Sequence, residues 1–264
     1  MYAFDYKRPA SLAEAKGAVG AEARFLAGGQ SLIQAMKLRL SQSDLLVDLG
    51  GIAELEAIRM DGGRLVIGAM ATHAAVASSA DVKKACPALA ELAAGIGDPM
   101  VRNMGTIGGS IANADPAACY PSAVLALDAT IHTDRRTIPG GEFFTGLYET
   151  ALQPGELITA VSFPAVQTAA YVKYRQPASR FALVGVFVAK TAGGVRVGVT
   201  GAKGHAFRAT EIEAALAKSF TPEAAKAVKM PTTDINADMH GSAEYRAAMI
   251  SVMASRAVAA ALAH

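Results

Sequence analysis

Two glycine-containing loops are the parts of this sequence whose residue types best suit ligand binding. In the first, Ala27-Gly28-Gly29-Gln30-Ser31, a predicted strand ends, two glycines turn the backbone and a predicted helix begins at once. This order directs free backbone N–H groups and the positive end of a helix toward one point, which suits a phosphate. Because glycine has no Cβ, the backbone can approach that anion closely. Taken alone, this loop can equally be read as an ordinary strand-to-helix turn.

The second loop, Thr106-Ile107-Gly108-Gly109-Ser110, lies much further along the chain. The surrounding stretch, 101–116, is dense in Gly, Asn, Asp and Ser, and it lacks the Lys and Glu residues typical of a long surface connection. Ile107 and Ile111 can anchor the stretch in the core. We therefore expect a binding loop of low periodicity that is packed into the body of the protein.

Neither loop matches the common nucleotide-binding motifs. The sequence has no Gly-x-x-x-x-Gly-Lys-Ser/Thr motif, and no Gly-x-Gly-x-x-Gly motif follows a strand, which argues against an ATPase-type loop and a Rossmann fold. Two uncharged loops that converge on one pyrophosphate would be a different way to bind a dinucleotide. No residues are arranged as a hydrolase nucleophile, and no metal spacing occurs, so we predict no catalytic or metal-binding residue. The histidines without such spacing are His73, His132, His205, His240 and His264.

Composition narrows the class of protein further. The 264 residues are 52% hydrophobic with a net charge of +2, which favours a sizeable core and argues against nucleic acid or a membrane surface as partner. Only Cys86 and Cys119 are present, too few for a disulfide framework or an iron–sulfur cluster of its own. The N-terminus lacks the apolar core of a signal peptide, and the apolar tail 247–263 is shorter and more interrupted than a membrane span of ~20 residues. We expect a cytoplasmic protein.

Periodicity and capping patterns predict the elements that position the two loops. Capping-box patterns beginning at Ser11, Ser31 and Thr210 predict helices that start there, and Thr221-Pro222 predicts another. Further helices are expected over 73–79, 88–94 and 242–262. Strands are expected over 24–27, 45–49, 65–68, 129–133, 157–163, 171–175, 183–191 and 195–201.

These elements predict an α+β protein of two domains. The boundary is placed at 164–168, where mixed α/β patterns give way to three consecutive strands joined by short loops, which favours an antiparallel meander. The N-terminal domain would span 1–165, with sub-lobes of about 1–55 and 56–165. The C-terminal domain would span 168–264 and combine the three-stranded sheet with helices.

The two glycine loops together, within 26–32 and 101–110, resemble the FAD-binding medium subunit of the xanthine dehydrogenase and aerobic carbon monoxide dehydrogenase family, the molybdenum hydroxylases. Short motifs similar to those of the family also occur over 36–39, 45–49, 154–158 and 201–215, so the resemblance covers essentially the whole chain. It implies a vanillyl-alcohol-oxidase-like (PCMH-type) FAD-binding domain followed by a CO dehydrogenase flavoprotein C-terminal-like domain.

By this resemblance the glycine loops hold the FAD pyrophosphate through backbone N–H groups and hydroxyls, Ile158 makes an aliphatic contact to the isoalloxazine, Lys173 lies close to the flavin, and Phe181 lies against the ring face. The residues so predicted to bind the cofactor are Ala27, Gly28, Gly29, Gln30, Ser31, Leu32, Thr106, Ile107, Gly108, Gly109, Ser110, Asp115, Cys119, Ile158, Lys173 and Phe181.

One departure from the family pattern concerns Cys119. Family members often read Asp-Pro-Ala-Ala-Asp after the second loop, and the last Asp bonds the ribityl or ribose region of the cofactor. Here the stretch ends in Cys119, which cannot supply a charged acceptor. The corresponding hydrogen bond is therefore expected to be weaker, absent or moved to another residue, with a lower affinity for FAD.

The resemblance implies an electron-transfer flavoprotein. Electrons would pass from [2Fe–2S] clusters on a small partner subunit, through FAD, to quinone, oxygen or NAD, while a large partner subunit carries the molybdopterin; the complex would be a dimer of heterotrimers. The alternative is a stand-alone flavin-binding regulatory or assembly module without an electron-relay role. A self-contained flavin oxidase is less favoured, because 264 residues leave little room for a substrate lobe.

Overall fold

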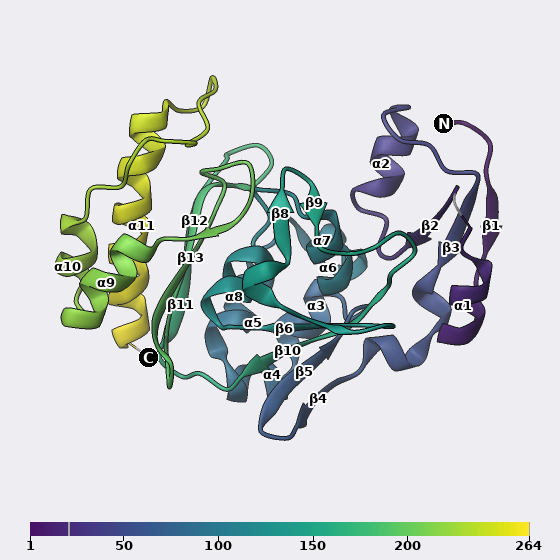
Figure 1. Ribbon diagram of the computed structural model, residues 1–264, viewed down its shortest axis with the longest axis horizontal. Coiled ribbons are helices and arrows are strands. Elements are labelled where there is room, and N and C mark those ends of the chain that lie inside the picture. Colours follow the sequence, from purple (N-terminus) through teal and green to yellow (C-terminus); the bar gives the residue numbers. More distant parts are fainter. Residues whose placement is uncertain (21, 264) are drawn as a thin grey trace.

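The computed structural model describes residues 1–20 and 22–263, and three lobes follow one another along the chain (Figure 1). In this view the N-terminal lobe (1–56) lies on the right, the central lobe (57–166) in the middle and the C-terminal lobe (169–263) on the left. Helices and strands occur in each lobe, so the predicted α+β class is confirmed. His264, whose predicted lack of a metal role was stated above, lies outside the described residues.

A three-stranded parallel sheet of order β1-β3-β2 forms the N-terminal lobe. Its small core includes Val47, Leu49 and Ile52. The Ser11 hydroxyl accepts from the Glu14 N–H, so the predicted start of the first helix is confirmed. The elements are β1 (Asp5–Lys7), α1 (Leu12–Ala18), β2 (Ala23–Leu26), α2 (Leu32–Lys37), β3 (Leu45–Asp48) and the 3₁₀ turns η1 (Leu49–Gly51) and η2 (Ala53–Glu56).

The capping box predicted at Ser31 is wrong, although the helix α2 does begin at the following residue. Ser31 has φ −106° and ψ −53°, and its side chain makes no capping hydrogen bond. A capping residue is normally extended, so in this helical conformation the hydroxyl is not directed at the free amides of the first turn. The Ser31 hydroxyl is consequently free to face a ligand.

An antiparallel sheet of order β4-β5-β10-β6-β7 is the base of the central lobe, with helices packed above it. The main core lies between sheet and helices and includes Leu65, Ile67, Ile107 and Phe163. The elements are β4 (Ile58–Asp61), β5 (Arg64–Gly68), α3 (His73–Ser78), α4 (Ala80–Ala85), α5 (Pro87–Ala94), α6 (Pro99–Met104), α7 (Ile107–Asn113), α8 (Tyr120–Ala126), β6 (Thr130–Thr133), β7 (Thr137–Pro139), η3 (Gly140–Glu142), β8 (Phe144–Gly146), β9 (Glu149–Thr150) and β10 (Ile158–Pro164).

The stretch predicted as a binding loop of low periodicity is largely helical. The Asp98 carboxylate caps α6 by accepting from the Val101 N–H, and the Thr106 hydroxyl caps α7 by accepting from the Gly109 N–H. Two glycines in the first turn of α7 disfavour a helix by about 1 kcal/mol each, so helix propensity does not predict this helix. Burial of Ile107 and Ile111, which was predicted, holds the helix in place.

In the C-terminal lobe, a four-stranded antiparallel sheet of order β11-β12-β13-β14 replaces the three strands that were predicted. The apolar run of β12 is buried on both faces: Phe187 and Ala189 join the central core, while Val184, Val186 and Val188 pack toward the C-terminal helices. The elements are β11 (Ala169–Arg175), β12 (Ala182–Thr191), β13 (Gly194–Thr200), β14 (Phe207–Arg208), α9 (Thr210–Lys218), α10 (Pro222–Ala227) and α11 (Ala243–Ala263).

Two helix starts in this lobe were predicted with different success. The Thr221 hydroxyl caps α10 by accepting from the Ala224 N–H, with Pro222 in the first turn, as predicted. The capping box at Thr210 is wrong, because Ala209 is the capping residue and offers no side-chain oxygen. Glu213 turns instead into the lobe, where it accepts from the Val197 N–H at 2.9 Å and from Arg208.

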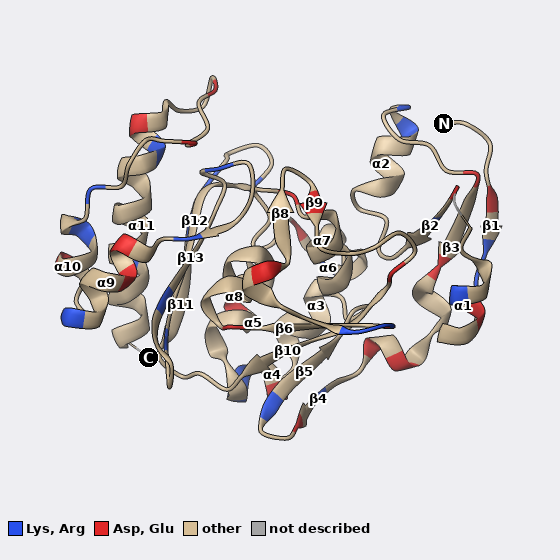
Figure 2. Ribbon diagram, viewed as in Figure 1, with Lys and Arg blue, Asp and Glu red and all other residues tan. Residues whose placement is uncertain are grey.

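The helix α11 is the one described helix that is long and apolar enough to cross a membrane by length and composition. Half of its most apolar window is buried, and it packs on the sheet through residues such as Ile250, Ala254 and Ala257, so it is a core helix of this lobe. Charged residues of both signs are scattered over all three lobes (Figure 2).

Arg246 fastens α11 to the sheet and gives a test of the C-terminal lobe. This side chain is 4% exposed, and its Nη1 donates to the carbonyl oxygens of Leu183 at 2.9 Å and Gly201 at 3.0 Å. We expect Arg246→Met to lower the free energy of unfolding by about 3 kcal/mol, because two inward-facing carbonyls lose their donor. Urea unfolding measures this. The exposed Arg256 of the same helix gives the control Arg256→Met, expected to change stability by less than about 0.5 kcal/mol; equal effects would contradict the role assigned to Arg246.

Candidate functional site

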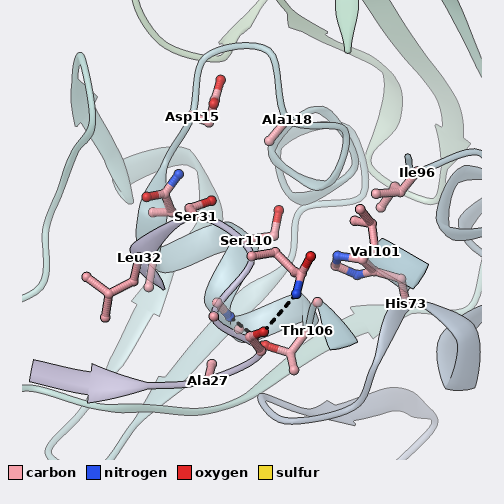
Figure 3. A pocket seen from close by; sticks show the side chains of 18 of the residues that line it. Ala27, Ser31, Leu32, His73, Ile96, Val101, Thr106, Ser110, Asp115 and Ala118 are labelled. Atoms are coloured by element: carbon pink, nitrogen blue, oxygen red, sulfur yellow. Dashed lines mark hydrogen bonds between the residues drawn. The ribbon is translucent and has the colours of Figure 1, made fainter. Parts of the chain in front are cut away.

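A pocket of about 450 Å³ opens where the three lobes meet. Figure 3 shows Ser31 and Leu32 on one side, His73, Ile96 and Val101 on the other, and Thr106 and Ser110 between them. The first side is the start of α2 in the N-terminal lobe, the second belongs to α3, α6 and their connections, and the C-terminal lobe closes the pocket with residues of β11 and the 176–181 loop. The pocket has the size and mixed lining of a cofactor site.

Fifteen of the sixteen predicted cofactor-binding residues line this one pocket. The exception is Ile107, which is fully buried and whose N–H donates to the Ala71 carbonyl, so its side chain serves the core. The binding role of the others stays a prediction. The residues brought together are Ala27, Gly28, Gly29, Gln30, Ser31, Leu32, Thr106, Gly108, Gly109, Ser110, Asp115, Cys119, Ile158, Lys173 and Phe181.

The two glycine loops pack directly on each other. A Cβ on Gly28 would lie 1.9 Å from the carbonyl oxygen of Met104, and a Cβ on Gly109 would lie 3.2 Å from the Cβ of Ala27. Gly108 is equally confined, because its Cβ would lie 2.5 Å from the Cβ of Ala69. Two segments far apart in sequence therefore form one continuous wall of backbone, which only glycine at these positions allows.

The first loop presents unpaired amides to this wall. Within the described residues, the backbone N–H groups of Gly28, Gly29, Gln30 and Ser31 donate no hydrogen bond. The hydroxyls of Ser31 and Ser110 are also without a partner in the part of the chain that is described. Several N–H and O–H donors around a Gly-Gly turn form the kind of concavity that binds phosphate oxygens. The donor set thus fits a pyrophosphate.

Cys119 and Lys173 meet on the wall contributed by the C-terminal lobe. The Lys173 Nζ lies 3.3 Å from the Cys119 Sγ, and both residues line the pocket. No described carboxylate forms an ion pair with Lys173. Asp115, the one acidic residue among those predicted to bind the cofactor, accepts from the Ala117 N–H at 2.9 Å and from the Tyr148 hydroxyl at 3.4 Å. A positive charge without an acidic partner therefore faces the pocket.

Glu156 is a pocket residue that sequence reasoning missed. Its carboxylate is fully buried and accepts from Arg136 (Nε to Oε1, 2.9 Å) and from the Gln153 N–H at 2.8 Å. The hydrogen bonds from Arg136 hold the pKa of Glu156 at about 2, below its ordinary 4.5. The pairing depends on the register between β6 and β10, which no local signal reveals.

His73 also went unrecognised as a pocket residue. Its side chain is 5% exposed, and its Nε2 lies 2.6 Å from where a Cβ on Gly105 would be, so a glycine makes room for the imidazole. The Nδ1 is buried without a hydrogen-bond partner. Burial, together with the nearby Arg102 guanidinium, holds the pKa of His73 at about 4, below its ordinary 6.5. The imidazole of His73 therefore lines the pocket without a charge at pH 7.

This pKa predicts a dependence of stability on pH. Between pH 6.5 and 4 the unfolded chain takes up a proton on His73 that the folded chain does not, so the free energy of unfolding falls as pH falls. The loss attributable to His73 should reach about 3 kcal/mol, and His73→Phe should abolish that part of the slope. Urea unfolding at several pH values measures it. His240→Phe, at an exposed position, is the control, and an unchanged slope in His73→Phe would refute the assignment.

The sequence and the fold both match known proteins. Residues 2–166 match the family described as FAD binding domain in molybdopterin dehydrogenase. The chain is 37% identical to the carbon monoxide dehydrogenase medium chain of Hydrogenophaga pseudoflava, over 98% of this chain and 96% of that one. It is 32% identical to the nicotine 6-hydroxylase medium subunit of Paenarthrobacter nicotinovorans, over 97% of this chain and 96% of the relative.

Solved structures agree with this. The carbon monoxide dehydrogenase from Hydrogenophaga pseudoflava, in a form lacking the Mo-pyranopterin moiety of its cofactor, superimposes with a TM-score of 0.88 at 37% identity and covers 98% of this chain and 97% of its own. Quinoline 2-oxidoreductase from Pseudomonas putida 86 gives a TM-score of 0.88 at 30% identity, with 98% and 97% coverage. The resemblance inferred from the glycine loops is thereby confirmed, and the chain belongs to the FAD-binding medium subunits of the molybdenum hydroxylases, an oxidoreductase family that includes carbon monoxide dehydrogenase.

Proposed function

We propose that this chain binds FAD in the pocket between its lobes and relays electrons from iron–sulfur clusters on a partner subunit to an external acceptor. The observation that carries the proposal is the wall formed by the two glycine loops, where four backbone amides and two hydroxyls that are unpaired within the described residues line one pocket. FAD, when bound, supplies the exchange between single electrons and electron pairs. The chain supplies binding, orientation and local charge.

The other residues of the pocket have distinct proposed roles. Ile158, 3% exposed at the start of β10, offers an apolar contact to the flavin ring. Phe181, 46% exposed in the 176–181 loop, covers the face of the ring. Lys173 places its ammonium where it can stabilise negative charge on the cofactor, because opposite charges attract strongly at a partly buried site.

The remaining cofactors are assigned to partner subunits. No group of His, Cys, Asp or Glu that could hold a metal occurs among the described residues, and the whole sequence has only two cysteines. Relatives are named as medium chains, which implies large and small chains beside them. We infer a molybdopterin on the large subunit and [2Fe–2S] clusters on the small one, in a dimer of heterotrimers. The domain division at 164–168 is part of the same proposal.

Substitution of the loop glycines tests the cofactor site. In Gly28→Ala or Gly108→Ala the new Cβ must push the backbone of Met104 or Ala69 aside, which separates the donors that meet the pyrophosphate. We expect the Kd for FAD to rise at least about tenfold, since each lost hydrogen bond costs about 1 kcal/mol. FAD titration followed by flavin fluorescence measures this. Gly141→Ala, where a Cβ meets nothing within 4 Å, is the control. Full FAD affinity in both loop variants would exclude this pocket.

Reduction experiments test the relay. The isolated chain, loaded with FAD, should not lose its visible flavin absorbance when mixed with an organic substrate that the complete complex oxidises. The same substrate should bleach the flavin once the molybdenum and iron–sulfur subunits are added, because electrons reach it only through them. The measurement is anaerobic absorbance of the chain alone and in the complex. Bleaching of the isolated chain would show that it oxidises the substrate itself.

A further inference from the structure

One face of the C-terminal sheet carries a row of polar side chains. Lys173, Gly185 and Thr200 are register partners across β11, β12 and β13, so they share one face of the sheet. Tyr171, two residues before Lys173 on β11, projects from the same face. A Cβ on Gly185 would lie 2.5 Å from the Tyr171 hydroxyl oxygen and 2.8 Å from the Thr200 Oγ1, so this glycine makes room for both hydroxyls.

Cys119 lies against this row. It directly precedes α8, which packs on β12 and β13. The Lys173 Nζ donates to the Cys119 Sγ at 3.3 Å. The Tyr171 hydroxyl lies beside the side chains of both Cys119 and Thr200. We call these four residues, Cys119, Tyr171, Lys173 and Thr200, the Cys119 cluster.

Two hydroxyls of the Cys119 cluster are buried with their hydrogen-bonding capacity unused. Thr200 is 0% exposed, and neither its Oγ1 nor the Tyr171 hydroxyl has a hydrogen-bond partner among the described residues. Burial, and next the Cys119 side chain, raise the pKa of Tyr171 well above its ordinary 10, so the phenol keeps its proton. Buried hydroxyls normally find a partner, because an unpaired one costs free energy. A thiol sulfur is only a weak acceptor, so the cluster lacks a strong acceptor at the position of the sulfur.

The two cysteines of the chain differ in their access to solutes. Cys119 is 5% exposed and lines the pocket together with Lys173. Cys86 is 0% exposed, does not line the pocket, and burial raises its pKa to about 11. Protein thiols react with peroxides where the sulfur can be reached and a cation lies beside it, whereas thiols buried in apolar surroundings are inert. Only Cys119 meets these conditions.

We propose that Cys119 is a site of reversible oxidation by hydrogen peroxide, and that the oxygen of the resulting sulfenic acid accepts from the donors of the Cys119 cluster. The sulfur attacks one peroxide oxygen, so that an S–O bond forms and the O–O bond breaks. Two electrons pass from the sulfur to the leaving hydroxide, which takes the thiol proton and departs as water. The products are one sulfenic acid and one water for each peroxide consumed.

The added oxygen supplies what the cluster lacks. It is an acceptor beside the Tyr171 and Thr200 hydroxyls, and its anion pairs with Lys173, which forms no ion pair within the described chain. Cys86 does not reach the pocket, so no disulfide within the chain competes for the oxidised sulfur. Reduction by an external thiol therefore returns Cys119 to its starting state.

Trapping of the sulfenic acid tests this proposal. The purified full-length chain, without added FAD, is treated with hydrogen peroxide and dimedone, which labels sulfenic acids. Mass spectrometry then follows the labelling of the two cysteine-containing peptides over time. The chains compared are wild type, Tyr171→Phe/Thr200→Val, and the control Tyr174→Phe. Tyr174 is 41% exposed on the same strand, and its side chain projects from the opposite face of the sheet.

In wild type, dimedone should label Cys119 and leave Cys86 unlabelled. Without dimedone, the Cys119 peptide should gain one oxygen, and dithiothreitol should remove it. Tyr171→Phe/Thr200→Val keeps the shape of both side chains, and labelling should be at least about tenfold slower, because two donors to the transferred oxygen are lost. The control should be labelled at the wild-type rate. Urea unfolding checks that each variant is folded, and Tyr171→Phe alone replaces the double variant if that one is not.

Three results would overturn the proposal: no label on Cys119 in wild type, equal labelling of Cys119 and Cys86, or a wild-type rate in the folded hydroxyl variant. The first two mean that the pocket does not select this thiol, and the third means that the two hydroxyls do not serve the oxygen. The experiment contains no flavin, so failure of the chain to bind FAD would refute the proposed function and leave this result unchanged.

Discussion

The contact between Gly28 and the carbonyl of Met104 is the constraint on which this pocket depends. At this contact the backbones of the two loop segments touch. A Cβ added to Gly28 would lie 1.9 Å from that oxygen, so no side chain fits there. Close packing, and not backbone conformation, requires glycine at these positions. Among the glycines of the two loops, only Gly29 has a left-handed backbone, at φ 70°. Glycine at 28 and 108 thus serves the approach of one segment to another, and the free amides gather as a result.

Each loop is held by a different lobe. The segment of the second loop runs beside the chain that follows β5: the His73 N–H donates to Gly105, Ile107 to Ala71 and Gly108 to Ala69. The first loop follows β2 of the N-terminal sheet directly. The pocket therefore exists only while the N-terminal and central lobes stay docked, and the 176–181 loop and Lys173 add the third lobe. Lobe packing and ligand binding are thus coupled by the same contacts.

Signals that act within a few residues could be read from the sequence. The cap at Ser11 was predicted from the glutamate three residues further on, and the cap at Thr221 from the proline that follows it. The same pattern failed at Thr210, where the glutamate three residues on is captured by Val197 and Arg208. Tertiary contacts override local preference in such cases.

In the pocket, too, some residues could be predicted from the sequence and others depend on tertiary contacts. The glycine loops could be found because family resemblance carries their spacing, whereas His73 and Glu156 could not. Each of these two depends on which strands and loops lie side by side, His73 on Gly105 and Glu156 on Arg136. The helix α7 was missed for a related reason, since its glycines oppose a helix locally while burial of Ile107 enforces it.

The charges around the pocket show how this chain accommodates Cys119. Arg136 pairs with Glu156, so that carboxylate adds little negative field, and His73 is neutral at neutral pH. In the family pattern an aspartate at position 119 would lie beside Lys173 and neutralise it; here the lysine meets a thiol at 3.3 Å. The substitution thus removes a directed acceptor and leaves a cation unpaired. With FAD bound as proposed, Lys173 would attract the anionic cofactor and offset part of the hydrogen bond that an aspartate at position 119 would supply.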